Sequence, residues 1–307
     1  MKASFIRKFG AAEVLEYGEL PDPVPAPGEV LIDIHAASIN AADWKMRAGQ
    51  YPAKIDFPHV LGRDFSGVVA ALGAGAGDFK LGEAVFGVCE VPREGAYAER
   101  IAIRQEIVAR KPERLSHVQA AAIGLIGLTA LISIEETLKL KAAETILIQG
   151  GAGGVAGFAI ALAKHLGARV ITTASAANHA YVRSLGADQA IDYREQDFSK
   201  IVANVDAVFD TVGGEVTTKS FAVLRPGGRL ASVAAGGSAP TSPRRDVSSL
   251  RPQVGRDRPH LERVAKLVAQ GIVPIPEIVE YPLAQAAAAH RVSEARHLRG
   301  KLVLKVR

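Results

Sequence analysis

The glycine-rich run at residues 151–156 has the spacing G-x-G-x-x-A. In such a run one glycine permits a tight turn, another lets backbone N–H groups approach a pyrophosphate, and the small last residue lets a helix pack close to the preceding strand. Apolar segments at 145–149 and 169–173 flank the run and the helical pattern at 155–166. This context predicts a dinucleotide-binding turn. Its residues are Gly151, Ala152, Gly153, Gly154, Val155 and Ala156.

The end of the second apolar segment indicates which dinucleotide binds. In NAD-binding proteins an Asp or Glu at this point binds the ribose hydroxyls. Residues 172–179 contain no acid, so nothing there would repel a 2′-phosphate. The sequence therefore favours NADP over NAD. The polar side chains that could contact the phosphate are Ser175, Asn178, Tyr193 and Arg194, although Tyr193 also suits a half-buried strand.

Two kinds of sequence pattern surround the turn. Up to residue 111, short apolar segments alternate with Pro and Gly, which is typical of a β-rich module. From about residue 116, apolar segments alternate with helical stretches, which indicates a parallel sheet covered on both faces. We expect this α/β domain to be inserted into the β-rich one, with residues 301–306 returning to the first module. The expected strands are 30–34, 65–72, 84–91, 100–108, 145–149, 169–173, 190–193, 206–211 and 229–234, and the expected helices are 155–166, 177–185 and 216–224.

Composition and charge exclude several classes of protein. With 307 residues, 48% of them apolar, the chain is long and apolar enough to fold. Its one cysteine excludes an internal disulfide and any multi-thiolate zinc site. The net charge of +5 is too small to indicate nucleic-acid binding. The apolar stretch at 120–134 is too short for a membrane span and residues 1–10 lack the apolar block of an export signal, so we expect a cytoplasmic protein.

Further motifs over nearly the whole chain resemble those of one family, the medium-chain dehydrogenases/reductases, and within it the zinc-independent quinone and enone reductases. This resemblance implies a Rossmann doubly wound parallel sheet inserted into a GroES-like β-rich catalytic domain. It places residues 1–120 and 269–307 in the GroES-like domain and 121–268 in the NADP-binding domain. It also implies NADPH as hydride donor and a homodimer. The motifs are SINAADWK at 38–45, GRDFSGVV at 62–69, GLTA at 127–130, the glycine turn, LGAD at 185–188, FDTVGG at 209–214, LRPGG at 224–228 and RGK at 299–301.

The zinc enzymes of this family differ from the chain at their metal ligands. They have a cysteine near position 40, Gly-His-Glu near position 62 and four clustered cysteines. Here Asn40, Arg63 and Asp64 occupy the corresponding positions. His59 could be a lone ligand, but a histidine that follows a proline in a turn better suits a structural role. We therefore expect no metal. Without a Lewis acid, hydride should go to an acceptor that spreads negative charge itself, a quinone or an α,β-unsaturated carbonyl compound.

The resemblance also assigns candidate catalytic residues. In related reductases the loop that holds Asn40 lies by the nicotinamide, so Asn40 would orient the cofactor or the substrate oxygen. Lys45 would polarise that oxygen or deliver a proton, unless it is simply solvated. Tyr51 at the pocket entrance and Arg63 are weaker alternatives, and Arg63 could instead pair with a neighbouring aspartate. Asp43 would orient the loop rather than act as a base.

The resemblance assigns the cofactor contacts of the Rossmann half as well. Thr129 would lie near the nicotinamide ribose or phosphate. Backbone groups of the glycine turn would contact the pyrophosphate. The residues that would face the nicotinamide end are Gly213, Ala235 and Gly236, although the glycines at 236–237 also suit a plain turn.

Residues 239–259 depart from the family pattern, because they are rich in Pro, Ser and Arg where relatives have another apolar strand. This puts the sixth strand of the sheet, the usual dimer contact and part of the substrate pocket in doubt. The five arginines within 244–258 suit a solvated loop better than an anion-binding patch.

These observations together predict an NADPH-dependent reductase of quinones or enones, with a small-molecule substrate, no membrane association and no nucleic-acid partner. A catalytically weak NADPH-binding sensor or scaffold is the alternative, because fold does not settle function. An enoyl-reducing module of a polyketide assembly is a third hypothesis, which the lack of flanking linker sequence disfavours.

Overall fold

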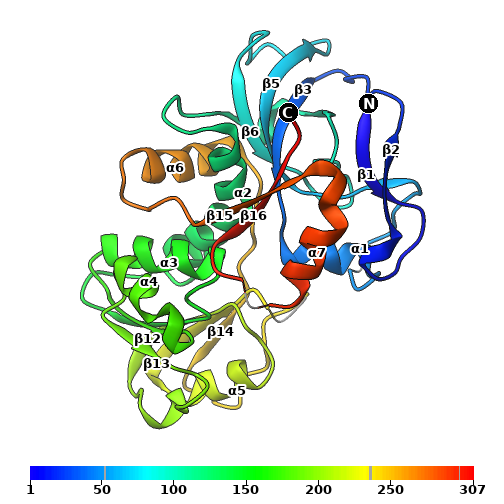
Figure 1. The fold of residues 1–307 in the computed structure, drawn as a ribbon. Coiled ribbons are helices and arrows are strands. Elements are labelled where there is room, and N and C mark those ends of the chain that lie inside the picture. The colour runs from blue at the N-terminus through cyan, green and yellow to red at the C-terminus, as the bar shows by residue number, and fades with distance from the viewer. Residues whose placement is uncertain (52, 235–236, 297) are drawn as a thin grey trace. The chain divides into compact units, whose positions relative to one another are not determined.

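The computed structural model describes residues 1–51, 53–234, 237–296 and 298–307, and the chain forms two compact units (Figure 1). The β-rich unit consists of Met1–Leu125, Arg256–Ala269 and Glu277–Arg307. The α/β unit consists of Ile126–Gly255 and Gln270–Pro276. Each unit has its own sheet and its own apolar core.

The β-rich unit contains a seven-stranded sheet in the order β15-β16-β3-β5-β6-β8, in which β7 also pairs with β3. The last strand, β16, pairs antiparallel with β3, so the C-terminal segment returns to the first module as predicted. A separate three-stranded sheet has the order β2-β1-β4. The strands are β1 (Lys2–Ile6), β2 (Leu15–Glu19), β3 (Glu29–Ser38), β4 (His59–Val60), β5 (Asp64–Leu72), β6 (Ala84–Val88), β7 (Arg100–Arg104), β8 (Val108–Arg110), β15 (Ile278–Pro282) and β16 (Lys301–Lys305).

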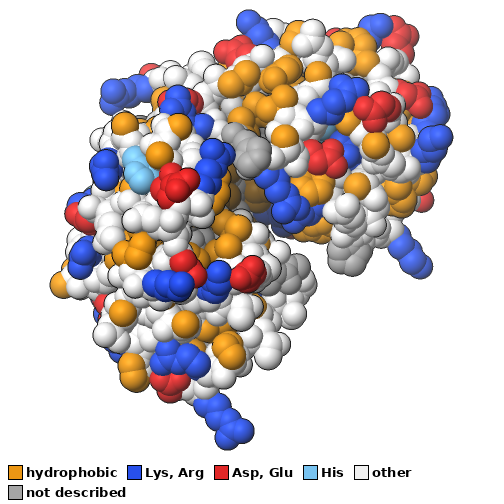
Figure 2. Space-filling model, turned by 60° about the horizontal axis from the view of Figure 1, so that its bottom comes forward, with side chains coloured by type: hydrophobic (Ala, Val, Ile, Leu, Met, Phe, Trp, Pro, Cys, Tyr) orange, Lys and Arg blue, Asp and Glu red, His pale blue; other side chains and the backbone are white. Residues whose placement is uncertain are grey.

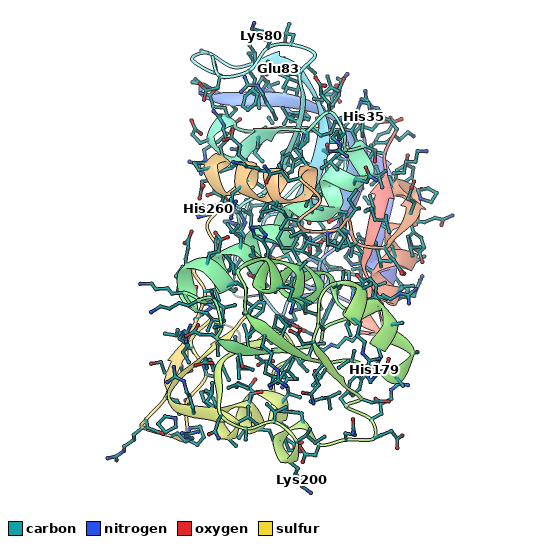
Figure 3. The ribbon with its side chains drawn as sticks, turned by 90° about the vertical axis from the view of Figure 1, so that its left-hand side faces the viewer. His35, Lys80, Glu83, His179, Lys200 and His260 are labelled. Carbon is teal, nitrogen blue, oxygen red and sulfur yellow. The ribbon has the colours of Figure 1, made fainter. Side chains whose placement is uncertain are left out.

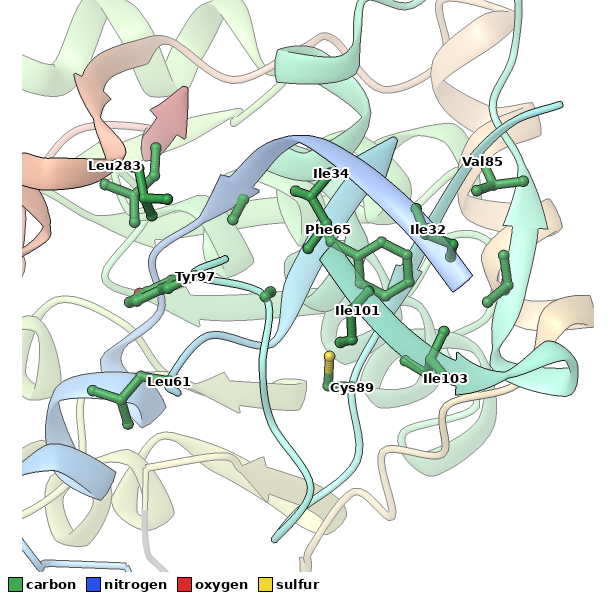
Figure 4. Close-up of a cluster of buried hydrophobic side chains, with 14 of the residues drawn as sticks. Ile32, Ile34, Leu61, Phe65, Val85, Cys89, Tyr97, Ile101, Ile103 and Leu283 are labelled. Carbon is green, nitrogen blue, oxygen red and sulfur yellow. The ribbon is translucent and has the colours of Figure 1, made fainter. Parts of the chain in front are cut away.

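The core of the β-rich unit forms where the apolar side chains of these strands meet. Ile32 and Ile34 from β3 lie beside Phe65 from β5, as expected for alternate residues on one face of a sheet (Figure 4). Cys89 is fully buried in the same cluster, and burial raises the pKa of its thiol. The thiol is therefore a packing group at neutral pH.

The α/β unit contains a six-stranded parallel sheet in the order β11-β10-β9-β12-β13-β14. Numbered within the unit this order is 3-2-1-4-5-6, the strand order of a Rossmann fold, so the predicted fold class is confirmed. The sixth strand, which the sequence put in doubt, exists as three residues beside β13. The strands are β9 (Thr145–Gln149), β10 (Arg169–Thr173), β11 (Gln189–Ile191), β12 (Val205–Asp210), β13 (Leu224–Ser232) and β14 (Ser248–Leu250).

The helices of both units are mostly short. In the described part of the chain, one helical stretch, His117–Thr137, is by length and composition apolar enough to cross a membrane, and 83% of its most apolar window is buried inside the protein. A core helix of a soluble protein passes the same test. The α-helices are α1 (Ala41–Arg47), α2 (His117–Leu131), α3 (Gly154–His165), α4 (His179–Ser184), α5 (Glu215–Ala222), α6 (Arg258–Ala269) and α7 (Ala286–Glu294). A π-helical turn covers Ile132–Thr137, and 3₁₀ turns cover Ala12–Val14, Gln105–Ile107, Ala176–Asn178, Phe198–Lys200 and Leu283–Gln285.

The arginine-rich segment is mostly loop with Arg245 and Arg251 exposed, as its composition suggested, but two of its arginines bind backbone carbonyls. Arg244 pairs with Asp246 and donates to the carbonyl oxygens of Phe221 and Leu224. Arg258 donates to the carbonyl oxygens of Val108 and Gln105. Guanidinium groups can satisfy exposed carbonyls at strand and helix ends, which composition alone does not reveal.

Basic side chains are spread over the face seen in the space-filling view rather than gathered in one patch of it. In the space-filling view, Lys and Arg side chains alternate with acidic and apolar ones (Figure 2). Many form ion pairs, such as Lys164 Nζ with Asp188 Oδ1 at 2.6 Å. The face in view therefore shows no continuous basic stripe.

Candidate active site

Asn40, which immediately precedes α1 in the β-rich unit, has its side-chain amide held from both ends. Its Nδ2 donates to Asp64 Oδ2 at 2.7 Å, and its Oδ1 accepts from Lys301 Nζ at 2.8 Å. The two contacts fix which end of the amide is the donor. One N–H and one lone pair of the amide remain for a ligand.

Asp64 is the anionic centre of this clamp. Its Oδ2 accepts from Ser38 Oγ at 2.6 Å, and its Oδ1 accepts from the backbone N–H of Leu125 at 2.7 Å. Lys301 Nζ lies 3.9 Å from Asp64 Oδ2 and donates to the carbonyl oxygen of Ile39 at 2.7 Å. Burial lowers the pKa of Lys301, and the nearby carboxylate opposes this change. The opposite charges of the buried Lys301 and Asp64 thus offset part of the cost of removing each of them from water.

Asp43 fixes the first turn of α1. Its Oδ2 accepts from the backbone N–H of Asn40 at 2.8 Å and from the Tyr97 hydroxyl at 2.9 Å. Its Oδ1 is buried and has no hydrogen-bond partner among the described residues. Burial, followed by the negative charge of Glu94, raises the pKa of Asp43 from 3.8 to about 7, and the Arg63 guanidinium opposes the shift.

The raised pKa of Asp43 predicts a specific dependence of stability on pH. Between pH 4 and pH 7 the folded state retains a proton that the unfolded state has lost, so this group makes the protein less stable as the pH rises. Relative to Asp43→Asn, the wild type should lose stability, on the order of 2–4 kcal/mol, between pH 4 and pH 8. Urea unfolding of both proteins across this range measures the difference. A difference independent of pH would contradict the prediction.

Arg63 pairs with a residue that the sequence did not suggest. Its Nε donates to Glu94 Oε1 at 2.7 Å, whereas Asp43 Oδ1 lies 3.9 Å away. The expected ion pair between Arg63 and Asp43 is therefore longer than the ion pair between Arg63 and Glu94. The guanidinium carbon lies 4.7 Å from the centre of the Tyr51 ring, and Nη1 donates to the Tyr51 hydroxyl at 3.4 Å. His59 Nε2 lies 3.2 Å from Oε2 of Glu94, which agrees with a structural role for His59.

A chain of buried polar groups extends from Asp43 away from Asn40. Arg47 Nη1 donates to His290 Nδ1 at 3.2 Å, and His290 Nε2 lies 3.2 Å from the Tyr97 hydroxyl that donates to Asp43. Burial, followed by the charge of Arg47, lowers the pKa of His290 to about 3, so the ring is neutral. The neutral ring accepts at Nδ1 and therefore carries its proton on Nε2. Figure 4 shows the Tyr97 ring among the apolar side chains of the core.

The side chain of Lys45 lies over an aromatic ring. Its Nζ is 5.7 Å from the centre of the Trp44 ring, and Lys45 is half-buried. Trp44 is almost fully buried, and its Nε1 has no hydrogen-bond partner among the described residues. Trp44 thus packs as a core residue that limits the positions open to Lys45.

The α/β unit forms the glycine turn where the sequence placed it. The turn joins the end of β9 to α3, and the N-cap of that helix is Gly153. A Cβ built on Gly151 would lie 2.3 Å from Thr172 Oγ1, whereas one on Gly153 would meet nothing closer than 3.4 Å. The chain itself therefore requires glycine at 151, and the space outside Gly153 suits a close backbone approach by a pyrophosphate. The free N–H groups of α3 begin at this turn.

Gly213 lies in a second tight turn, after β12. Asp210 Oδ1 accepts from the backbone N–H groups of Val212 at 2.9 Å and Gly213 at 3.1 Å. Gly213 has φ +89°, a conformation that favours glycine. Thr129 lies in α2 within the same unit and is mostly buried. Ala235 and Gly236, the other residues assigned to the nicotinamide end, lie outside the described residues.

The end of β10 carries the residues assigned to the 2′-phosphate. Asn178 Nδ2 donates to Ser175 Oγ at 3.1 Å, so these two side chains lie together. Tyr193 is half exposed after β11, and the Arg194 guanidinium lies 5.8 Å from its ring centre. His179 begins α4 on the same unit (Figure 3) and its Nε2 lies 3.1 Å from the carbonyl oxygen of Ala174. Neutral and basic side chains thus gather here, and one carboxylate lies among them, since Asp192 Oδ2 accepts from the backbone N–H of Ala176 at 3.1 Å.

The donor set does not fit the catalytic zinc of related enzymes. The amide of Asn40 is engaged by Asp64 and Lys301, and the guanidinium of Arg63 cannot ligate a cation. Among the residues that the structure describes, no group of three or more His, Cys, Asp or Glu side chains could hold a metal ion.

Comparisons with known proteins agree with this architecture. Residues 26–113 match the alcohol dehydrogenase GroES-like domain, and residues 185–304 match the zinc-binding dehydrogenase family. The NADPH-dependent alkenal/one oxidoreductase of Arabidopsis thaliana chloroplasts is 32% identical over 99% of this chain and 79% of its own length. The quinone oxidoreductase of Coxiella burnetii has a TM-score of 0.93 at 36% identity, covering 100% of this chain and 99% of that chain. The Escherichia coli quinone oxidoreductase complexed with NADPH has a TM-score of 0.91 at 29% identity, with both chains fully covered.

Longer proteins also match. The chain is 30% identical, over 98% of its length, to a mycocerosic acid synthase-like polyketide synthase of Mycobacterium tuberculosis, but it spans only 15% of that protein. The full-length similarity to single-function reductases is decisive for the family, because it covers both the β-rich and the α/β unit. The chain belongs to the medium-chain dehydrogenase/reductase family, in its quinone oxidoreductase and enone reductase branch.

Proposed function

We propose that the protein reduces quinones or α,β-unsaturated carbonyl compounds with NADPH and without a metal. The observation that carries this proposal is the glycine turn beside a strand end that lacks any acid, in a chain whose relatives include NADPH-dependent reductases. NADPH supplies the hydride when it is bound. The chain must therefore hold the acceptor oxygen and provide it with a proton.

The clamped amide of Asn40 is proposed to orient the acceptor oxygen or the nicotinamide. Its free N–H is held in place by Asp64 and Lys301, so little reorganisation is needed when charge develops on the oxygen. Lys45 is proposed as the proton donor, since its ammonium group is steered by the Trp44 ring rather than held in an ion pair that the structure describes. Tyr51 and Arg63 are proposed to line the acceptor pocket.

The cofactor contacts are proposed to follow the turn and the strand ends. The glycine turn would bind the pyrophosphate and Ser175, Asn178 and Tyr193 the 2′-phosphate. Thr129 and Gly213, with Ala235 and Gly236 beyond the described part, would lie near the nicotinamide ribose and ring. The proposed domains are 1–120 with 269–307 and 121–268. A homodimer in the cytoplasm, without membrane or nucleic-acid partners, completes the proposal.

Steady-state oxidation of NADPH tests this function. The acceptors are 9,10-phenanthrenequinone, 1,4-benzoquinone and a 2-alkenal, each measured with NADPH and with NADH. We expect turnover of at least one acceptor and a clear preference for NADPH. Tight NADPH binding without turnover of any acceptor would favour the sensor or scaffold instead.

A carrier-bound enoyl thioester is a second candidate substrate, favoured by the similarity to polyketide synthases. The N-acetylcysteamine thioester of crotonic acid, added to the same assay, distinguishes it. A kcat/KM for this thioester above those of the quinones and the alkenal would establish it as the preferred class.

The NADPH preference should depend on the end of β10. Ser175→Asp places a carboxylate where the 2′-phosphate is expected, so the affinity for NADPH should fall about 100-fold while NADH binding persists. Ser184→Asp, an exposed position in α4, is the matched control and should change neither affinity. Fluorescence titration measures both. Unchanged NADPH affinity in Ser175→Asp would remove the proposed phosphate site.

A further inference from the structure

Two arginines of the β-rich unit, Arg63 and Arg256, carry buried N–H groups that have no partner among the described residues. The Arg63 side chain is 2% exposed, and its Nη2 has no hydrogen-bond partner among the described residues. Nε of Arg256 is also buried and has no hydrogen-bond partner among the described residues, although the residue as a whole is partly exposed. A buried donor left unpaired costs about 1–3 kcal/mol, and more when it is charged.

The two guanidinium groups also act on each other. Burial, followed by the positive charge of Arg63, lowers the pKa of Arg256. Two like charges held in a partly buried site repel each other unless an anion lies between or beside them. The Tyr51 hydroxyl accepts from Arg63 Nη1 at 3.4 Å, so it lies at the same guanidinium group.

The carboxylates around this pair are already engaged. Glu94 accepts from Arg63 Nε at 2.7 Å and also contacts His59 at 3.2 Å. Glu90, which acts electrostatically on Arg256, accepts from Arg104 Nη2 at 2.6 Å. Asp43 Oδ1 lies 3.9 Å from Arg63 Nε. None of the described carboxylates accepts from Arg63 Nη2 or from Arg256 Nε.

We propose that Arg63 and Arg256, with the Tyr51 hydroxyl, form an anion subsite that selects acceptors carrying a carboxylate, sulfonate or phosphate group. The proposal rests on the proposed function for its acceptor. Planar guanidinium groups match the oxygens of such anions, and two of them sharing one anion would relieve both the repulsion and the unpaired donors.

A matched pair of acceptors tests the subsite. The pair is 1,2-naphthoquinone and 1,2-naphthoquinone-4-sulfonate, compared at fixed ionic strength with saturating NADPH. Wild type should show a higher kcat/KM for the sulfonate, and the ratio of the two values should fall at least tenfold in Arg256→Met. Arg245→Met removes the same charge from an exposed position of the same segment and should leave the ratio unchanged. A ratio that stays constant in Arg256→Met would overturn the proposal.

Calorimetry provides a readout that does not require turnover. Binding of 2-naphthalenesulfonate is measured to the protein saturated with NADP⁺, and its Kd should rise at least tenfold in Arg256→Met but not in Arg245→Met. If saturation with NADP⁺ abolishes this binding, the two arginines serve the phosphates of the cofactor and the acceptor subsite is rejected. If no quinone is reduced but the sulfonate binds as expected, the proposed function fails while the anion site stands.

Discussion

Replacing Gly153 with Val should abolish tight NADPH binding without unfolding the protein. The backbone at Gly153 has φ −76° and ψ 158°, an extended conformation that valine adopts readily. A Cβ at this position would meet nothing closer than the Gly150 carbonyl oxygen at 3.4 Å. The added side chain would instead fill the space through which the pyrophosphate approaches the backbone. The Kd for NADPH should rise at least 100-fold, or about 2.7 kcal/mol.

A control variant shows whether the loss of NADPH binding comes from the place of the added side chain or from the Gly→Val change as such. Gly77→Val adds the same atoms at an exposed glycine, where an added Cβ would have no neighbour within 4 Å. Both variants should unfold near the wild-type urea midpoint, and only Gly153→Val should lose NADPH in a fluorescence titration. Wild-type affinity in Gly153→Val would show that the dinucleotide does not lie over this turn.

Removing the carboxylate of Asp64 should destabilise the protein strongly. Asp64→Ala removes from the buried Lys301 its ion-pair partner and releases the donors of Ser38 and Asn40. The free energy of unfolding should fall by about 3–5 kcal/mol, as for other broken buried ion pairs. Urea unfolding measures the loss.

Two further variants distinguish the effect of breaking the buried Asp64–Lys301 pair from the effect of removing any charged side chain. Glu16→Ala breaks the exposed pair between Glu16 and Arg7, in which both side chains are more than half exposed, and should change stability by less than about 1 kcal/mol. The double variant Asp64→Asn with Lys301→Met contains no unpaired buried charge, so it should be more stable than Asp64→Ala. Equal losses in Asp64→Ala and Glu16→Ala would refute the clamp as a source of stability.

The α/β unit was largely predictable because its signals are local. Strands β9 and β10 have the predicted bounds, and the turn between β9 and α3 falls on the G-x-G-x-x-A run. Buried parallel strands appear in the sequence as short continuous apolar segments, and the glycine turn needs its residue types for steric reasons within a few residues. The end of β13 was less predictable, because it ends at Ser232 rather than at 234.

The β-rich unit was predicted less completely. Strands β1 and β2 were not foreseen, since their residues include Lys, Ser, Glu and Gly and they gain stability from pairing with each other. The expected strand at 100–108 is divided into β7, a 3₁₀ turn and a separate β8. These differences arise from non-local strand pairing, which a short sequence window does not contain.

The sequence by itself determined the family, the glycine turn and the lack of an acid at the end of β10, because each depends on residue types within a short stretch. Only the tertiary structure decided how Asn40 is held, since Asp64 and Lys301 come from distant strands and meet only when β3 lies between β5 and β16. It also decided that Arg63 pairs with Glu94 and that Tyr97 and His290 support Asp43. The RGK motif contained a signal for Lys301, but Glu94, Tyr97 and His290 had none. Buried polar groups must find partners, and the fold rather than the spacing in sequence determines which partners are within reach.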